Sequence, residues 1–178
     1  MSTTHVLGRL AHTLGQSSDA GRHWAAIAET CQQLFGYGLL TGLVYLQQEK
    51  LMRRIYSSNE AISPLGGFKA TGKGPWSDRV LDQGLPYIGR DEADIRTVFS
   101  EAEDLVARGL HAVLNIPVWY GGEVLGSINI LGPRGAYNDV PEALIHLVAG
   151  VCVPALASAR ESAREAARGI DSASLQSV

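Results

Sequence analysis

Cysteine and net charge are both scarce in this chain of 178 residues. Its two cysteines, Cys31 and Cys152, are too few for a disulfide framework, and their apolar helical surroundings indicate a packing role in a reducing compartment. The 15 Lys and Arg residues nearly balance the 18 Asp and Glu residues, so no basic surface for nucleic acid is visible. We therefore expect a cytoplasmic protein that binds no nucleic acid.

Targeting, membrane and metal-binding patterns are also missing. The N-terminus has no basic start followed by an apolar run, so no secretory signal is predicted. The uncharged stretch 143–159 is shorter than a membrane span and contains Gly150 and Pro154, so we expect a core helix there and no membrane contact. No His, Cys, Asp or Glu residues have the spacing of a structural metal site, and we expect no metal and no cofactor.

The clearest pattern that is present is an apolar hairpin over residues 111–132. It predicts strands at 111–119 and 123–131, joined by a tight turn at Gly121–Gly122, because glycines supply the positive φ angles that such turns require. Neither strand alternates cleanly between apolar and polar residues. Both faces of the sheet are therefore expected to be covered.

Each strand of this hairpin carries one asparagine, Asn115 or Asn129. A buried amide is costly unless it is hydrogen-bonded, so each residue is either a satisfied core amide or a ligand contact. A two-residue turn places the two amides on opposite faces of the sheet, whereas a three-residue loop at 120–122 places them on the same face. We expect the two-residue turn, with Asn115 facing a pocket.

The rest of the chain predicts helices and further strands. Apolar spacing indicates helices at 3–15, 19–35, 76–83 and 140–167, with one or two short helices within 91–109. Strands are expected at 39–47, at 85–88 and at 51–57, the last a more exposed edge because it contains Arg53 and Arg54. The Gly- and Pro-rich segment 59–75 is either a functional loop or a mobile surface loop.

This order of elements resembles a GAF domain. The strongest match is the hairpin, in which Ile116-Pro117-Val118 stands for the family's Val-Pro-Leu and Leu125-Gly126 begins the second strand. Pro86-Tyr87 and Gly109-Leu110 also fit. The resemblance implies an α/β (α+β) fold in which a central antiparallel sheet has the first, second and last helices on one face. It places a small-molecule pocket on the other face, under the loops and short helices of 59–109.

The resemblance covers about residues 19–160 of one expected domain, 1–178, with a disordered tail at 170–178. The chain lacks the Asn-Lys-Phe-Asp/Glu signature of members that bind cyclic nucleotides. It also lacks the pocket cysteines of bilin-binding members and of free methionine sulfoxide reductases. Because sensor GAF domains usually precede an output domain and this chain has no room for one, we expect a stand-alone module.

Candidate ligand-binding residues gather in 76–115 and in the second hairpin strand. They are Trp76, Arg79, Tyr87, Arg96, Phe99, His111, Asn115 and Asn129. The aromatic residues would form apolar walls, and Arg79 or Arg96 would supply charge for a small anionic or polar planar ligand. Each charged candidate also has a plainer alternative. Arg79 would be solvated, and Arg96 would form an internal salt bridge to Asp91, Glu92 or Asp94. His111 would be either a general base or a pH-sensitive ligand contact, or else a histidine that faces solvent.

No nucleophile with a general base can be assembled by spacing, so a binding module is favoured over an enzyme. The alternatives are a metal-free isomerase, lyase or hydrolase that acts on a small polar or anionic metabolite, and a purely structural dimerisation module. The alanines of the last helix permit close helix approach, so we expect a homodimer through the first and last helices. These alanines are Ala157, Ala159, Ala163 and Ala166.

Overall fold

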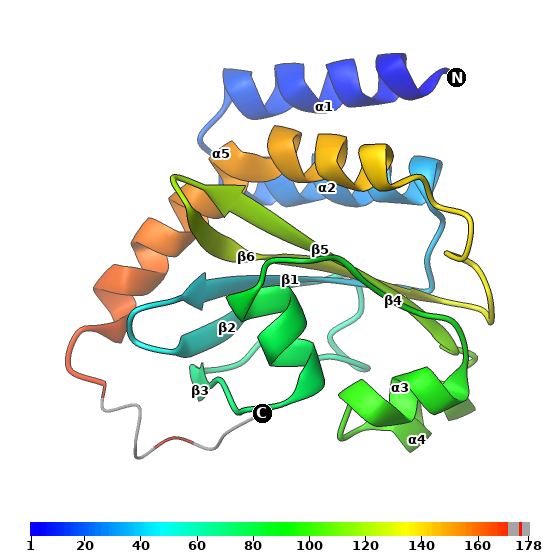
Figure 1. Cartoon of the computed structure of the whole chain (residues 1–178). Helices are drawn as coiled ribbons and strands as arrows, with labels where there is room; N and C mark the ends of the chain where they lie inside the picture. The colour runs from blue at the N-terminus through cyan, green and yellow to red at the C-terminus, as the bar shows by residue number, and fades with distance from the viewer. Residues whose placement is uncertain (171–174, 176–178) are drawn as a thin grey trace.

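A six-stranded antiparallel sheet organises the computed structural model, which describes residues 1–170 and 175 (Figure 1). The spatial order is β3-β2-β1-β6-β5-β4. The strands are β1 (Leu39–Leu46), β2 (Leu51–Ser57), β3 (Lys69–Ala70), β4 (Tyr87–Gly89), β5 (Ala112–Tyr120) and β6 (Glu123–Gly132). The predicted α+β architecture is confirmed. The predicted edge at 51–57 is covered only in part, because the two residues of β3 pair with Leu51 and Met52 and the rest of β2 has no strand on its outer side in the described residues. The tail expected at 170–178 lies almost wholly outside the described residues.

Three helices cover one face of the sheet (Figure 1). These are α2 (Ala20–Leu34) and α5 (Glu142–Ala167), with α1 (Thr3–Gln16) packed over both of them. The Trp24 ring of α2 stacks on Tyr56 of β2 at 5.1 Å between ring centroids. A Cβ atom on Gly42 of β1 would lie 2.2 Å from the Trp24 ring, so the glycine admits this close packing.

Helix α5 is long and apolar enough, by length and composition alone, to cross a membrane. Its most apolar stretch has a mean hydropathy of 1.7. In this fold the helix packs against β1, β5 and β6 through a buried stripe that includes Ile145, Val148 and Cys152. This packing is that of a core helix, as the sequence predicted.

The β5–β6 hairpin has the predicted two-residue turn but not the predicted register. Gly121 and Gly122 adopt φ angles of 61° and 82°. Leu125 is then an extra residue between the Val118–Gly126 and Trp119–Val124 pairs, which makes a β-bulge. The bulge moves every later pair by one residue, so Asn115 lies directly opposite Asn129 on the same face. The expectation that the two amides lie on opposite faces is therefore wrong.

The other face of the sheet is covered by the chain between β2 and β5 (Figure 1). This segment contains β3, the π-helical turn η1 (Ser77–Asp82) and the short helices α3 (Glu92–Val98) and α4 (Ala102–Ala107). The helix predicted at 76–83 is present, with the wider π-helical geometry over Ser77–Asp82. Because these elements are short, they do not seal the sheet and leave a cavity above its centre.

Candidate functional site

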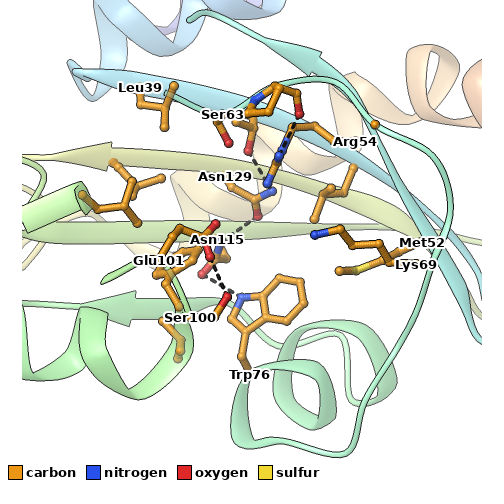
Figure 2. Close-up of a pocket in the computed structure, with 18 of the residues that line it drawn as sticks. Leu39, Met52, Arg54, Ser63, Lys69, Trp76, Ser100, Glu101, Asn115 and Asn129 are labelled. Atoms are coloured by element: carbon orange, nitrogen blue, oxygen red, sulfur yellow. Dashed lines mark hydrogen bonds between the residues drawn. The ribbon is translucent and has the colours of Figure 1, made fainter. Parts of the chain in front are cut away.

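A cavity of about 220 Å³ lies between the sheet and the covering segment (Figure 2). The sheet contributes apolar side chains, one hydroxyl, two amides and one arginine, namely Leu39, Thr41, Leu43, Met52, Arg54, Asn115, Asn129 and Leu131. The covering segment contributes Ser63, Pro64, Leu65, Gly66, Gly67, Lys69, Trp76, Val98, Phe99, Ser100, Glu101 and Leu105. Apolar walls with a few convergent polar groups are typical of small-molecule sites, and this volume suits a small metabolite.

A chain of hydrogen bonds crosses the floor of the cavity (Figure 2). Trp76 Nε1 donates to Asn115 Oδ1 at 3.1 Å, and Asn115 Nδ2 donates to Asn129 Oδ1 at 2.6 Å. Asn129 Oδ1 also accepts from the Ser127 hydroxyl at 3.0 Å, and Asn129 Nδ2 lies 3.4 Å from Thr41 Oγ1. Both amides thus have protein partners and also line the cavity, whereas ligand contact by either residue stays a prediction.

Each amide nitrogen of this pair has two N–H groups but makes one hydrogen bond within the described part of the chain. Asn115 is fully buried and Asn129 is 4% exposed. One N–H group of each amide therefore has no acceptor among the described residues. A ligand oxygen that reaches these groups would take bonds that the protein leaves open.

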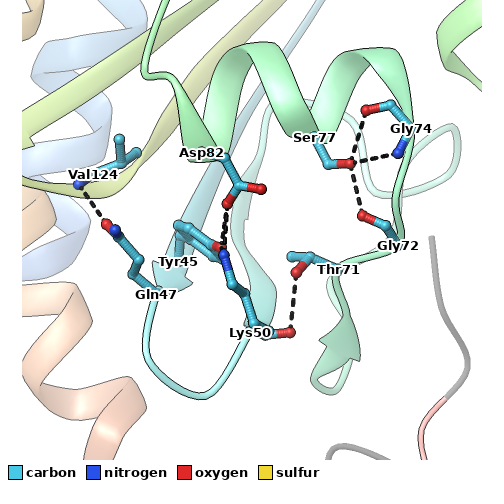
Figure 3. A network of polar contacts seen from close by, with 9 residues as sticks. All are labelled: Tyr45, Gln47, Lys50, Thr71, Gly72, Gly74, Ser77, Asp82 and Val124. Atoms are coloured by element: carbon cyan, nitrogen blue, oxygen red, sulfur yellow. Dashed lines mark hydrogen bonds and ion pairs between the residues drawn. The ribbon is translucent and has the colours of Figure 1, made fainter.

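The turn η1 that presents Trp76 is fixed at its C-terminal end by a charged network (Figure 3). Lys50 Nζ donates to Asp82 Oδ1 at 2.7 Å and to the Tyr45 hydroxyl at 3.1 Å, while that hydroxyl donates to Asp82 at 3.1 Å. The bond from Lys50 lowers the pKa of Asp82, and the Tyr45 bond acts in the same direction. Farther along the chain, Trp119 Nε1 donates to the Gly84 carbonyl at 2.8 Å.

The start of η1 is fixed by its own hydroxyl contacts (Figure 3). The Ser77 hydroxyl lies 2.8 Å from the Gly72 carbonyl oxygen and accepts a hydrogen bond from the Gly74 amide at 3.1 Å. With both ends held, the indole beside Ser77 has a defined position over the sheet. Trp76 is therefore a fixed wall of the cavity.

Three charged side chains line the cavity, and the sequence analysis identified none of them. Arg54 comes from the sheet, whereas Lys69 and Glu101 are exposed residues of the covering segment. Arg54 Nη1 donates to the Pro64 carbonyl at 2.9 Å, and burial lowers the pKa of its guanidinium. The available signal was the spacing of two between Met52 and Arg54, which puts both on one face of a strand.

Four of the eight predicted residues line the cavity, and four do not. Trp76, Phe99, Asn115 and Asn129 lie in its wall. The other four are Arg79, Tyr87, Arg96 and His111, and none of them lines it. Ligand binding by the first four remains a prediction.

The two arginines expected to supply charge have other partners. Arg79 Nε donates to the Pro86 carbonyl at 2.7 Å. Arg96 forms an exposed ion pair with Glu103 at 2.6 Å, so the alternative of an internal salt bridge to Asp91, Glu92 or Asp94 is wrong. Tyr87 packs between two apolar clusters beside the cavity, where burial raises the pKa of its hydroxyl.

His111 lies outside the cavity and joins the two short helices. Its Nδ1 is 2.8 Å from Glu92 Oε1, and its Nε2 is 3.1 Å from the Val106 carbonyl oxygen. Both partners are hydrogen-bond acceptors, one from α3 and one from α4. Arg134 pairs with the same carboxylate, and a hydrogen bond from the backbone N–H of Glu92, assisted by Arg134, lowers the pKa of Glu92.

No family model and no curated protein matches this sequence. Solved structures match its fold. The GAF domain of a phosphoenolpyruvate-protein phosphotransferase from Coxiella burnetii is 13% identical with a TM-score of 0.70, over 93% of this chain and 96% of that one. The chromophore-binding domain of a bacteriophytochrome from R. palustris is 13% identical with a TM-score of 0.62, over 91% and 61%. A type II free methionine-R-sulfoxide reductase from Thermoplasma acidophilum is 15% identical with a TM-score of 0.61, over 83% and 94%.

Proposed function

We propose that this chain, whose fold is GAF-like, is a cytoplasmic sensory or regulatory module that binds a small polar metabolite in the cavity above its sheet. The observation that carries the proposal is the Asn115–Asn129 pair. Two buried amides occupy the centre of the sheet, bond to each other and keep N–H groups directed at no protein acceptor in the described residues. The similarity to a phosphotransferase GAF domain and to a chromophore-binding domain supports a sensory context.

Binding is favoured over catalysis by the side chains that line the cavity. Both cysteines lie in the core cluster under the helices, on the opposite side of the sheet. Burial raises the pKa of Cys31 to about 12 and that of Cys152 well above its usual value, so neither supplies a thiolate near neutral pH. The similarity to a reductase therefore extends to the fold and has no counterpart in cysteine chemistry at this cavity.

A stability screen tests this proposal. Purified protein is heated with amino acids, organic acids and nucleotides in turn, and at least one compound is expected to raise Tm. The Asn115→Leu/Asn129→Leu double variant replaces both partners of the floor bond and should lose that shift while remaining folded. Arg79→Ala, outside the cavity, is the matched control and should keep the shift. An equal shift in the double variant would exclude this cavity as the site.

The same screen separates a binding module from an enzyme. Mass spectrometry of the stabilising compound after prolonged incubation should recover it unchanged. Its conversion would favour the metal-free isomerase, lyase or hydrolase in place of a sensor. A double variant that binds but does not convert the compound would assign the reaction to the amide floor.

We also propose that the chain forms a homodimer through α1 and α5. The alanines of α5 do not all remain available, because Ala163 is buried within the fold. An uncharged exposed stripe runs along α5 instead and consists of Ala143, Leu147, Gly150, Pro154 and Ser158. Leu147 is 55% exposed, which a subunit contact would cover.

Sedimentation at micromolar concentration tests the dimer. Leu147→Glu should shift the protein towards monomer, because a buried unpaired carboxylate is unfavourable. Leu85 is 44% exposed and lies away from α5, so Leu85→Glu is the matched control and should stay dimeric. A monomeric wild-type protein would rule the dimer out.

A further inference from the structure

One charged group in the cavity, the half-buried Arg54, forms no ion pair in the described part of the chain, although the charge of Glu101 acts on it. In the described part of the chain, Arg54 lies within ion-pairing distance of no Asp or Glu side chain. Its only hydrogen bond there runs from Nη1 to the Pro64 carbonyl, and its Nε is buried without a partner. The remaining guanidinium N–H groups are therefore available to an acceptor that the fold does not provide.

Arg160 shows what a neutralised arginine looks like in the same molecule. It also has a buried Nε without a partner, and its side chain is 12% exposed. Its Nη1, however, pairs with Glu123 at 2.8 Å. A half-buried guanidinium without such a carboxylate is unfavourable in the empty state, and a bound anion removes that cost.

We propose that Arg54 is the anchor for the carboxylate of a small monocarboxylic acid with an apolar or aromatic body. The proposal rests on the proposed function, since it assigns the ligand of the same cavity. A guanidinium presents planar, paired N–H groups that match a carboxylate. The floor amides of Asn115 and Asn129 then face the body of the ligand and can donate to one polar substituent on it.

The charges and walls of the cavity select this class of acid. Two cations, Arg54 and Lys69, and one anion, Glu101, line it, so the lining has one net positive charge and one ligand carboxylate balances it. Much of the cavity wall is apolar or aromatic and includes Leu43, Met52, Trp76, Phe99 and Leu131. A dianion would leave one charge unbalanced against these walls.

The cation also connects the ligand to the loop that covers the cavity. Pro64 and Gly66 belong to that loop, and their carbonyls accept hydrogen bonds from Arg54 and Arg53 at 2.9 and 3.1 Å. An anion bound to Arg54 would therefore contact a side chain that holds the loop in place. Ligand binding is expected to reduce the protease sensitivity of residues 63–67.

Calorimetry with matched acid and amide pairs tests the anchor. The probes are benzoate with benzamide and 3-methylbutanoate with its amide, so that only the charge differs within a pair. At least one acid should bind the wild-type protein about tenfold or more tightly than its amide. Phenyl phosphate, as the dianion, should bind more weakly than benzoate. Equal binding of acid and amide, or tighter binding of the phosphate, would overturn the carboxylate assignment without the need for any variant.

Variants then locate the charge. Arg54→Met keeps an apolar stem of similar length and should weaken the acid about tenfold or more while leaving the amide unchanged. Arg54→Lys should restore part of the affinity, and Arg79→Met should behave as wild type. If the acid binds equally to Arg54→Met, the anchor is wrong. If Asn115→Leu/Asn129→Leu then still abolishes binding, the proposed function survives that failure; if this double variant binds the acid normally, the cavity itself is excluded.

Discussion

The hydrogen bond between Asn115 and Asn129 offers a sharp test of the sheet register. Asn129→Leu removes three contacts at once, two to Oδ1 and one from Nδ2, and leaves the Asn115 amide and the Ser127 hydroxyl without their acceptor. At about 0.5–1.5 kcal/mol for each bond, less about 1 kcal/mol gained from the apolar side chain, we expect a net loss of about 0.5–3.5 kcal/mol in the free energy of unfolding. Asn115→Leu removes two contacts and, by the same reckoning, should cost up to about 2 kcal/mol.

The double variant measures the coupling between the two amides. Asn115→Leu/Asn129→Leu loses the shared bond only once and leaves neither amide without its partner. Its loss should therefore fall short of the sum of the two single losses by about 1 kcal/mol or more. The assay is urea unfolding of the four proteins at neutral pH, with Ser127→Ala, which removes a single bond, as the calibration.

Additive losses would show that the two amides share no contact. Residues on opposite faces of a strand pair do not touch, so a two-residue turn without the bulge would give a coupling near zero, within about 0.3–0.5 kcal/mol. A coupling above that range requires both amides on one face. The same measurement therefore tests the Leu125 bulge, on which the whole cavity floor depends.

Further predictions concern the turn that presents Trp76 and the packing over the sheet. Gly84→Ala should lower the free energy of unfolding by about 2–4 kcal/mol in thermal unfolding, because φ is 61° and the new Cβ would lie 1.9 Å from the Trp119 ring. Gly121 has the same φ with open space around it, so the control Gly121→Ala should cost only about 1 kcal/mol. Gly42→Ala should also destabilise by about 1–3 kcal/mol, since its Cβ would meet the Trp24 ring; tryptophan fluorescence that shows an unchanged Trp24 and an unchanged Tm would contradict this packing. Asp82→Asn should lower stability at neutral pH by less than about 1 kcal/mol, because the ion pair with Lys50 is about half exposed. The pKa of Asp82 is lowered in the fold, so the contribution of the ion pair to stability is present above the ordinary pKa of 3.8 and is lost as the pH falls through the lower pKa of the folded protein. Denaturation curves of the wild-type and Asp82→Asn proteins should therefore converge in acid, and a difference that persists there would argue against the pair.

Local pattern in the sequence was enough to determine the elements and the class of fold. The 3.6-residue spacing of apolar side chains located the helices α1, α2 and α5, and the Gly121–Gly122 pair located the turn of the central hairpin. These signals depend on neighbours within a few residues, so they can be read directly from the chain. The resemblance to a GAF domain followed from their order, and with it the face of the sheet on which to expect a cavity.

Only the tertiary structure decided how the cavity floor is built. The bulge at Leu125 depends on a contact between distant strands, because a Cβ atom on Gly126 would lie 1.9 Å from the Leu43 carbonyl oxygen of β1. No local pattern reports such an approach, and one extra residue reverses the face of every side chain beyond it. The two asparagines therefore meet, although the turn length that was correctly predicted implied that they could not.

Folding likewise determines which arginine lines the cavity. Arg54, Arg79 and Arg96 are chemically identical in the sequence, and the first appeared to lie on an exposed edge. In the structure Arg54 is half-buried and bonds to the Pro64 carbonyl of the covering loop, while Arg96 meets Glu103 in solvent. The sequence determines which charges a protein carries, but whether a charge loses its water and lacks a partner depends on what the rest of the chain places around it.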